Sequence, residues 1–177
     1  MRKTLSAATL LAVLSAPTFA ATMGNFNYDY FDARVGFDPL TYGGEASMSI
    51  HPNAHALGRI DSKFEGDYDA AAGIGFHAPI NDWADLTGDA LFHLVDAGDD
   101  DSEHRGVELT FGVRQWLGPQ LEVHGEGGYQ SIDDNEEWIG AAGARFYPTE
   151  LFSIGMEYRL NQFYDDQLMA TARFVMP

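Results

Sequence analysis

The sequence contains no cysteine, so disulfide bonds do not stabilise the fold and thiol chemistry is excluded. Basic residues are also few: ten lysines and arginines stand against 27 aspartates and glutamates, which gives a net charge of −17. Nucleic acid is therefore excluded as a partner, because binding phosphates requires neutralisation by Lys and Arg. Beyond the N-terminus, no uninterrupted apolar run reaches the roughly 18 residues that a membrane-spanning helix needs. A helical membrane protein is excluded as well.

The apolar run at the N-terminus is too short to span a bilayer as a helix, and it has the features of a secretion signal. Arg2 and Lys3 form a basic start, residues 5–14 are apolar, and small residues surround Ala20, as a signal peptidase prefers. We expect residues 1–20 to be a cleaved signal peptide, with cleavage after Ala21 as the alternative. Residues 21–177 then form a single domain, an outer-membrane β-barrel.

The strongest structural signal is an alternation with a period of two. Between residues 152 and 161 the apolar positions are Phe152, Ile154, Met156, Tyr158 and Leu160, and the small or polar positions between them include Glu157 and Arg159. This period places alternate side chains on opposite faces of a strand. Similar segments occupy residues 28–37, 44–51, 54–62, 67–78, 84–95, 105–117, 120–131, 137–147, 152–163 and 167–176. The pattern predicts an all-β fold, a single antiparallel up-and-down transmembrane β-barrel of ten strands, with eight strands as the alternative.

The connections between these segments are of two kinds. Residues 51–53, 78–82, 117–120 and 147–150 are short and contain proline, whereas residues 96–104 and 133–137 are acidic and longer. Outer-membrane barrels have short periplasmic turns and larger outward loops, so we assign the acidic connections to the cell surface. Their carboxylates could bind divalent cations, including ions that bridge lipopolysaccharide phosphates. The alternative is a solvated, self-repelling loop.

Charged residues occupy the face that would point into the barrel. We expect a lumen filled by an ionic network, because a ten-stranded barrel is narrow and an unpaired charge inside it would be costly. The predicted network consists of Asp32, Arg34, Arg59, Asp61, Asp69, Asp85, Asp89, Glu108, Arg114, Glu122, Glu126, Arg145, Glu157, Arg159 and Arg173.

A few spacings on this face are also compatible with chemistry. They are a metal site at Glu122-x-His124-x-Glu126, a pair formed by Asp89 and His93, and a Ser-x-His pair formed by Ser49 and His51. The first lacks a further ligand. The second pair is about 13 Å apart along a strand, which is too far for direct contact. The third lacks any further element of a catalytic site. We therefore expect no enzyme, no cofactor and no metal.

Aromatic residues gather near the predicted strand ends. Two aromatic girdles at the membrane interfaces are typical of transmembrane barrels. The predicted girdle residues are Trp83, Trp116, Tyr129, Trp138, Phe146, Tyr147, Phe152 and Tyr164.

Several segments resemble a known family of small outer-membrane barrels. These are the residues Tyr68-Asp69-Ala70-Ala71-Ala72-Gly73-Ile74-Gly75-Phe76, Trp83-Ala84-Asp85-Leu86, Gly106-Val107-Glu108-Leu109-Thr110-Phe111-Gly112-Val113-Arg114 and Tyr158-Arg159. Over residues 26–176 the chain resembles the diffusible signal factor-regulated outer-membrane proteins, within the OmpA-like and porin-like barrels. The resemblance implies a monomer that the barrel assembly machinery inserts among outer-membrane lipid and lipopolysaccharide. It also implies an association with biofilm or quorum-regulated traits, and it supplies no catalytic residues.

Taken together, these features predict a barrel with a plugged lumen and a structural or surface-interaction role. One alternative is a narrow porin-like channel for small solutes or ions. Others are a barrel enzyme acting on lipopolysaccharide or peptide, and a soluble periplasmic lipocalin-like binder whose apolar face lines a cavity. The many Gly and Ala residues on the apolar face argue against the last, since a ligand cavity would be lined by larger side chains.

Overall fold

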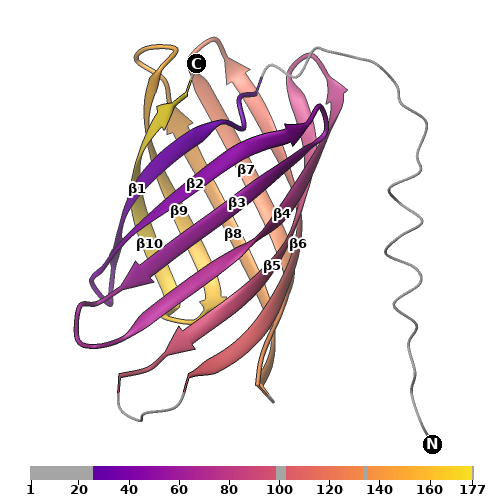
Figure 1. The fold of residues 1–177 in the computed structure, drawn as a ribbon. Helices are drawn as coiled ribbons and strands as arrows, with labels where there is room; N and C mark the ends of the chain where they lie inside the picture. Colours follow the sequence, from indigo (N-terminus) through magenta and orange to yellow (C-terminus); the bar gives the residue numbers. More distant parts are fainter. Residues whose placement is uncertain (1–25, 99–102, 134, 177) are drawn as a thin grey trace, which may run out of the picture.

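A computed structural model describes residues 26–98, 103–133 and 135–176. In these residues ten strands form one closed barrel, in which each strand pairs antiparallel with its neighbours in sequence and β1 pairs with β10 (Figure 1). The strands are β1 (Tyr30–Phe37), β2 (Thr41–His51), β3 (Ala54–Ser62), β4 (Tyr68–Asn81), β5 (Ala84–Asp96), β6 (His104–Gly118), β7 (Leu121–Ile132), β8 (Asn135–Phe146), β9 (Phe152–Gln162) and β10 (Asp165–Val175). The predicted fold class and the strand number of ten are confirmed.

The strand boundaries lie within about three residues of those that the alternation predicts. The largest differences are at the start of β2, which begins at Thr41, and at the end of β4, which continues to Asn81. Proline is tolerated near the end of β4 because few ladder donors are needed there. The register shifts between Pro79 and Asn81. The predicted signal peptide, residues 1–20, lies outside the described residues. In the described part of the chain, no helix is long and apolar enough to cross a membrane.

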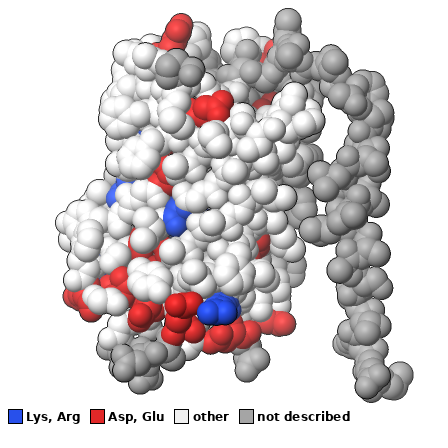
Figure 2. Space-filling view, viewed as in Figure 1, with Lys and Arg blue, Asp and Glu red and all other residues white. Residues whose placement is uncertain are grey.

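The two ends of the barrel differ in composition. The chain enters β1 and leaves β10 at one end, which we call the turn end, and acidic side chains gather at the opposite, loop end (Figures 1 and 2). The exposed acidic residues at the loop end are Asp38, Glu65, Glu103, Asp133, Glu136, Glu137, Asp165 and Asp166. The predicted acidic loop end is therefore present, although four residues of its densest run, 99–102, lie outside the described part.

The predicted difference in connection length holds only in part. The connections β2–β3, β4–β5 and β6–β7 at the turn end have two residues each, but β8–β9 has five. At the loop end β5–β6 has seven residues, whereas β7–β8 and β9–β10 have only two. The prediction of a loop at residues 133–137 was wrong, because Asn135 pairs with Ile132 and already belongs to β8. The charged side chains Glu136 and Glu137 are compatible with a strand here, because the start of β8 projects into water.

The two faces of the barrel wall are opposite in polarity. On β6, Val107, Leu109 and Phe111 are exposed, whereas Glu108 and Thr110 between them are buried to 2% exposure each. Away from their ends the other strands show the same division between faces, and the middle of the outer wall in Figure 2 is mostly white. The lipocalin-like alternative, with its apolar face inward, is therefore wrong.

Candidate functional site

One buried ion cluster in the lumen is centred on Asp32 of β1. Its Oδ2 accepts hydrogen bonds from Arg145 Nη2 at 2.9 Å and from Arg173 Nη2 at 2.8 Å, and Asp32 is only 2% exposed. The guanidinium of Arg173 also lies over the Tyr30 ring, 3.6 Å from its centroid. The Tyr30 hydroxyl in turn donates to Glu45 at 2.7 Å. Side chains from β1, β2, β8 and β10 are thus tied together across the barrel.

A second cluster continues this network toward the loop end. Arg34 binds both Glu45, at 2.7 Å, and Asp61. Arg159 lies 3.8 Å from the same Asp61 and pairs with Glu157 at 2.5 Å. Gly43 makes this arrangement possible, because a Cβ at that position would come within 1.8 Å of Asp61 Oδ1.

A histidine lies at the centre of the third cluster. His93 is completely buried, with Nδ1 2.7 Å from Asp69 and Nε2 3.1 Å from Glu108. Arg59 Nη2 donates to the same Glu108 oxygen at 2.7 Å. Two carboxylates therefore surround one imidazole and one guanidinium, and the cluster lies on the β3–β6 side of the lumen.

The fourth cluster lies at the turn end. Arg114 makes a two-pronged contact with Glu122, at 2.8 and 3.1 Å. The Tyr147 hydroxyl donates to the same Glu122 at 2.7 Å. The ring of Trp116 packs on Tyr147, with 4.9 Å between centroids.

The segment before β1 fills the turn-end mouth. Phe26 stacks on Trp116 at 5.5 Å, and Tyr28 stacks on His77 at 3.7 Å. The Tyr28 hydroxyl donates to Asp85 at 2.9 Å. Both inserted aromatic residues are at most 7% exposed. We call residues 26–29 the N-terminal plug. The alternation did not predict this role, although Phe26 and Tyr28 have even numbers, as do the inner-face residues of β1.

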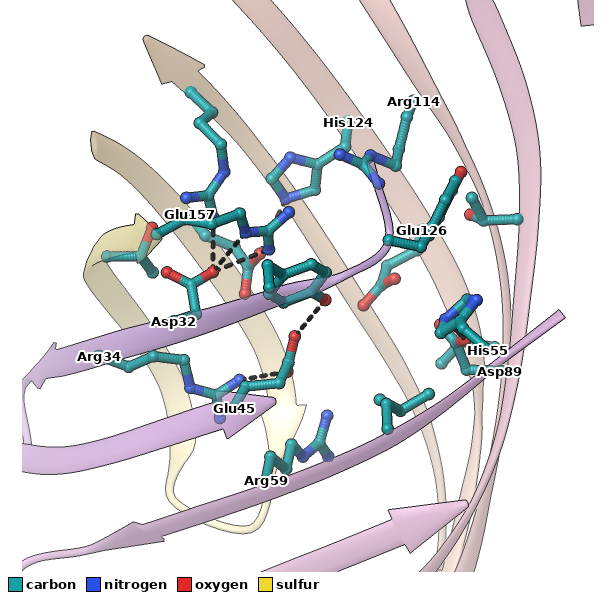
Figure 3. A pocket seen from close by; sticks show the side chains of 18 of the residues that line it. Asp32, Arg34, Glu45, His55, Arg59, Asp89, Arg114, His124, Glu126 and Glu157 are labelled. Atoms are coloured by element: carbon teal, nitrogen blue, oxygen red, sulfur yellow. Dashed lines mark hydrogen bonds and ion pairs between the residues drawn. The ribbon is translucent and has the colours of Figure 1, made fainter. Parts of the chain in front are cut away.

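Between these clusters remains a cavity of about 120 Å³. Figure 3 shows Arg59, Glu126 and Asp89 among the side chains around it. Asp89 lies 3.4 Å from His55 Nε2, and Gly75 leaves the space for that pair. Glu126 makes no hydrogen bond or ion pair with any described residue.

The predicted network can be compared with these clusters. All fifteen predicted residues lie on the inner face, and thirteen of them make ion pairs with Arg, His, Asp or Glu. Asp85 is bound instead by the Tyr28 hydroxyl, and Glu126 is unpaired. Some pairings are local, such as Arg114 with Glu122, but others join strands that are far apart in sequence, such as Asp32 with Arg145. The alternation could therefore identify the members of the network but not all of their partners.

The predicted girdle needs a correction. Trp83, Tyr129, Trp138, Phe146 and Phe152 lie on the outer face. Trp116 and Tyr147 instead face inward at the turn end, where they pack against each other. Tyr164 folds over the loop-end mouth and hydrogen-bonds Asp67 at 2.6 Å. A phenol or indole at a strand end can satisfy its polar atom inside the barrel as well as at a lipid interface.

Tyr164 and Asp67 connect two loop-end segments. The Asp67 carboxylate also accepts the backbone N–H groups of Lys63 and Glu65, each at 3.1 Å. Burial raises the pKa of Asp67, but these hydrogen bonds outweigh burial and hold its pKa below the ordinary value. The β3–β4 connection is thereby fixed to the β9–β10 turn.

The spacings considered for chemistry are used otherwise. Glu122 binds Arg114, and His124 binds Glu157 at 2.8 Å. Asp89 and His93 belong to separate pairs. His51 Nδ1 accepts the Asn53 N–H, while the backbone N–H of Ser49 binds Asp29. Among the described residues, no group of three His, Cys, Asp or Glu is placed to hold a metal ion.

Comparison with known proteins identifies the fold only. No protein-family model matches the chain, and no curated protein does. Among solved structures, the KdgM porin has a TM-score of 0.53 at 9% identity, with 84% of this chain and 99% of that chain covered. The NanC porin has a TM-score of 0.50 at 9% identity, with 83% and 99% covered. Omp33 of Acinetobacter baumannii has a TM-score of 0.45 at 8% identity, with 86% and 100% covered. The fold is that of a porin-like outer-membrane barrel.

Proposed function

We propose that this protein is an outer-membrane barrel whose lumen is closed by its own side chains. It would be exported through a cleaved signal peptide and inserted by the barrel assembly machinery. Its role would be structural or surface-interacting, without enzymatic activity, as in the diffusible signal factor-regulated barrels that its sequence resembles. The acidic loop end would face outward.

The observation that supports a closed lumen is the small size of the remaining cavity. About 120 Å³ is room for only a few water molecules. The four charge clusters surround this space, and the N-terminal plug covers its turn-end side. A hydrated ion would have to displace ion pairs that are already hydrogen-bonded and buried.

Single-channel recording in planar bilayers tests this proposal. The purified chain should insert and give no stable conductance steps. A mobility shift on SDS gels with and without boiling establishes separately that the protein is folded in the lipid preparation used for the recordings. Stable, reproducible conductance steps from the folded protein would refute the closed lumen.

A second candidate is a narrow porin-like channel. Two observations favour it: the fold is similar to two proteins described as porins, and Glu126 leaves one unpaired carboxylate in the cavity. A channel of this kind would prefer cations, since acidic residues outnumber arginines on the inner face. If steps appear, their reversal potential in a potassium chloride gradient should therefore show cation selectivity.

A further inference from the structure

A larger pocket opens at the loop end, outside the closed lumen. Its volume is about 560 Å³, within the roughly 300–1,000 Å³ typical of small-molecule sites. It lies between the β5–β6 connection, the start of β6, β7, β8 and the β9–β10 turn. Gln130, Glu137, Gln162, Phe163 and Asp165 line it, and Ala97, His104 and Asp133 form its other side. We call it the mouth pocket.

The side-chain amide of Gln130 provides a buried hydrogen-bond donor in the mouth pocket. The side chain is on the inner face of β7 and only 5% exposed, yet its Nε2 has no hydrogen-bond partner. Its strand neighbours are Glu108 and Glu137. Glu108 is already engaged by Arg59 and His93, and Glu137 is exposed. A buried amide N–H that makes no hydrogen bond is unfavourable, so this group is suited to donate to an acceptor oxygen on a ligand.

The rim of the pocket carries hydrogen-bond acceptors, whereas Gln130 provides a donor. Glu137 and Asp165 are exposed carboxylates, and they lie on the acidic end seen in Figure 2. Carboxylates accept hydrogen bonds and attract cations, and they repel anionic ligands such as uronates or phosphorylated sugars. Phe163 adds an aromatic face, and Gln162 adds a second amide. A matching ligand carries an ammonium group, a nearby hydroxyl oxygen and an apolar ring face.

We propose that the mouth pocket binds an amino sugar. The Gln130 amide donates to a hydroxyl or ring oxygen, the ammonium group lies between Glu137 and Asp165, and the sugar ring packs on Phe163. The inference rests on the proposed surface-interaction role, because it requires the loop end to face outward. It adds the class of ligand that this surface recognises.

Binding can be measured by calorimetry on the folded, full-length barrel in detergent micelles. The probe is a glucosamine tetramer, and D-glucosamine distinguishes recognition of a free sugar from recognition of a polymer. The N-acetylglucosamine tetramer has the same ring but no charge, and a galacturonate tetramer reverses the charge. We expect saturable binding of at least one glucosamine probe, binding at least tenfold weaker for the acetylated tetramer, and none for the galacturonate.

Substitutions locate the site. Gln130→Leu removes the donor at similar volume and should weaken binding about tenfold, the loss expected for one hydrogen bond. Glu137→Gln should weaken glucosamine binding and leave the weak acetylated ligand unaffected. Gln120→Leu, an exposed glutamine at the turn end, is the matched control and should bind like the original chain. The gel mobility shift verifies that each variant is folded.

Several results would overturn the inference. They are no binding of either glucosamine probe at millimolar concentration, equal binding of the acetylated tetramer, or an unchanged affinity in folded Gln130→Leu protein. Conductance steps with glucosamine binding retained would refute the closed lumen but support the mouth pocket. A barrel that gives no conductance steps and binds neither glucosamine probe would refute the proposed ligand of the mouth pocket and leave the closed lumen standing.

Discussion

Asp32→Asn is the most direct perturbation of the lumen. The substitution keeps the shape of the side chain and removes its charge. Oδ2 of Asp32 accepts from two arginines, with contacts of 2.8 to 3.0 Å. The amide would leave Arg145 and Arg173 without their shared counter-ion, and both are less than 10% exposed.

The expected cost depends on whether the lumen is dry. Removing one partner of a buried ion pair typically costs about 3–5 kcal/mol, because the remaining charge stays buried and uncompensated. The same pair in a water-filled pore would resemble a surface salt bridge, worth about 0–1 kcal/mol. The closed lumen therefore predicts a loss of at least ~3 kcal/mol in the free energy of unfolding.

Urea unfolding of the barrel in lipid vesicles, followed by tryptophan fluorescence, measures this difference. The matched control is Glu65→Gln at the loop end, which also converts a carboxylate to an amide but in an exposed side chain 4.0 Å from Lys63. Such a surface change should stay within about 0.5 kcal/mol. The slopes of the unfolding curves must agree for the midpoints to be comparable.

A loss below ~1 kcal/mol for Asp32→Asn, similar to the control, would refute the reasoning. Water would then be screening the arginines, and the lumen would be open enough to hydrate them. That result would favour the channel over the closed barrel.

Three further predictions concern other parts of the molecule. Tyr28→Ala should loosen the N-terminal plug. The chain has no cysteine, so a single cysteine introduced in place of Thr87, which lines the cavity, reports access to the lumen. A maleimide should label this cysteine faster in the Tyr28→Ala variant than in the protein that keeps Tyr28. The pKa of Asp67 is lowered from 3.8 by folding, so its contribution to stability is present above that pH and is lost as the pH falls through the folded value. The stability difference between Asp67→Asn and the original chain should accordingly be largest near pH 7 and vanish near pH 2, as measured by urea unfolding. Trp138, which is 76% exposed on the outer wall, should be quenched by brominated lipids, and a lack of quenching would place it in water.

The sequence alone predicted the wall of the barrel well and its interior contacts poorly. The alternation depends only on neighbouring residues, so it identified the inner and outer faces of all ten strands. Pairing inside the lumen depends on how the sheet closes. Asp32 meets Arg145 and Arg173, which are 113 and 141 residues away, only because β1 pairs with β10.

Strand ends were the least predictable positions. Trp116 and Tyr147 have the odd-even position of inner-face residues, but aromatic residues near a turn also suit the lipid interface, and that preference led to the wrong assignment. The decisive contact was the stacking of Phe26 on Trp116, because Phe26 precedes β1 and lies outside any strand. The repeating pattern could not predict such a contact, because a plug segment follows the shape of the mouth rather than the period of a sheet.

The polarity of the wall also determines which environment the fold requires. An alternating pattern is unchanged when the barrel is turned inside out, so the alternation alone could not choose between a membrane barrel and a ligand-binding barrel in water. The ion pairs decide between these two barrels, because Asp32, Glu122 and His93 are nearly inaccessible and bind their partners on the inner side of the wall. Once charge occupies the inside, exposed side chains such as Phe111 and Ile154 must cover the outside. A continuous apolar belt of this kind is unusual on a monomer in water, and lipid is the surrounding that stabilises it.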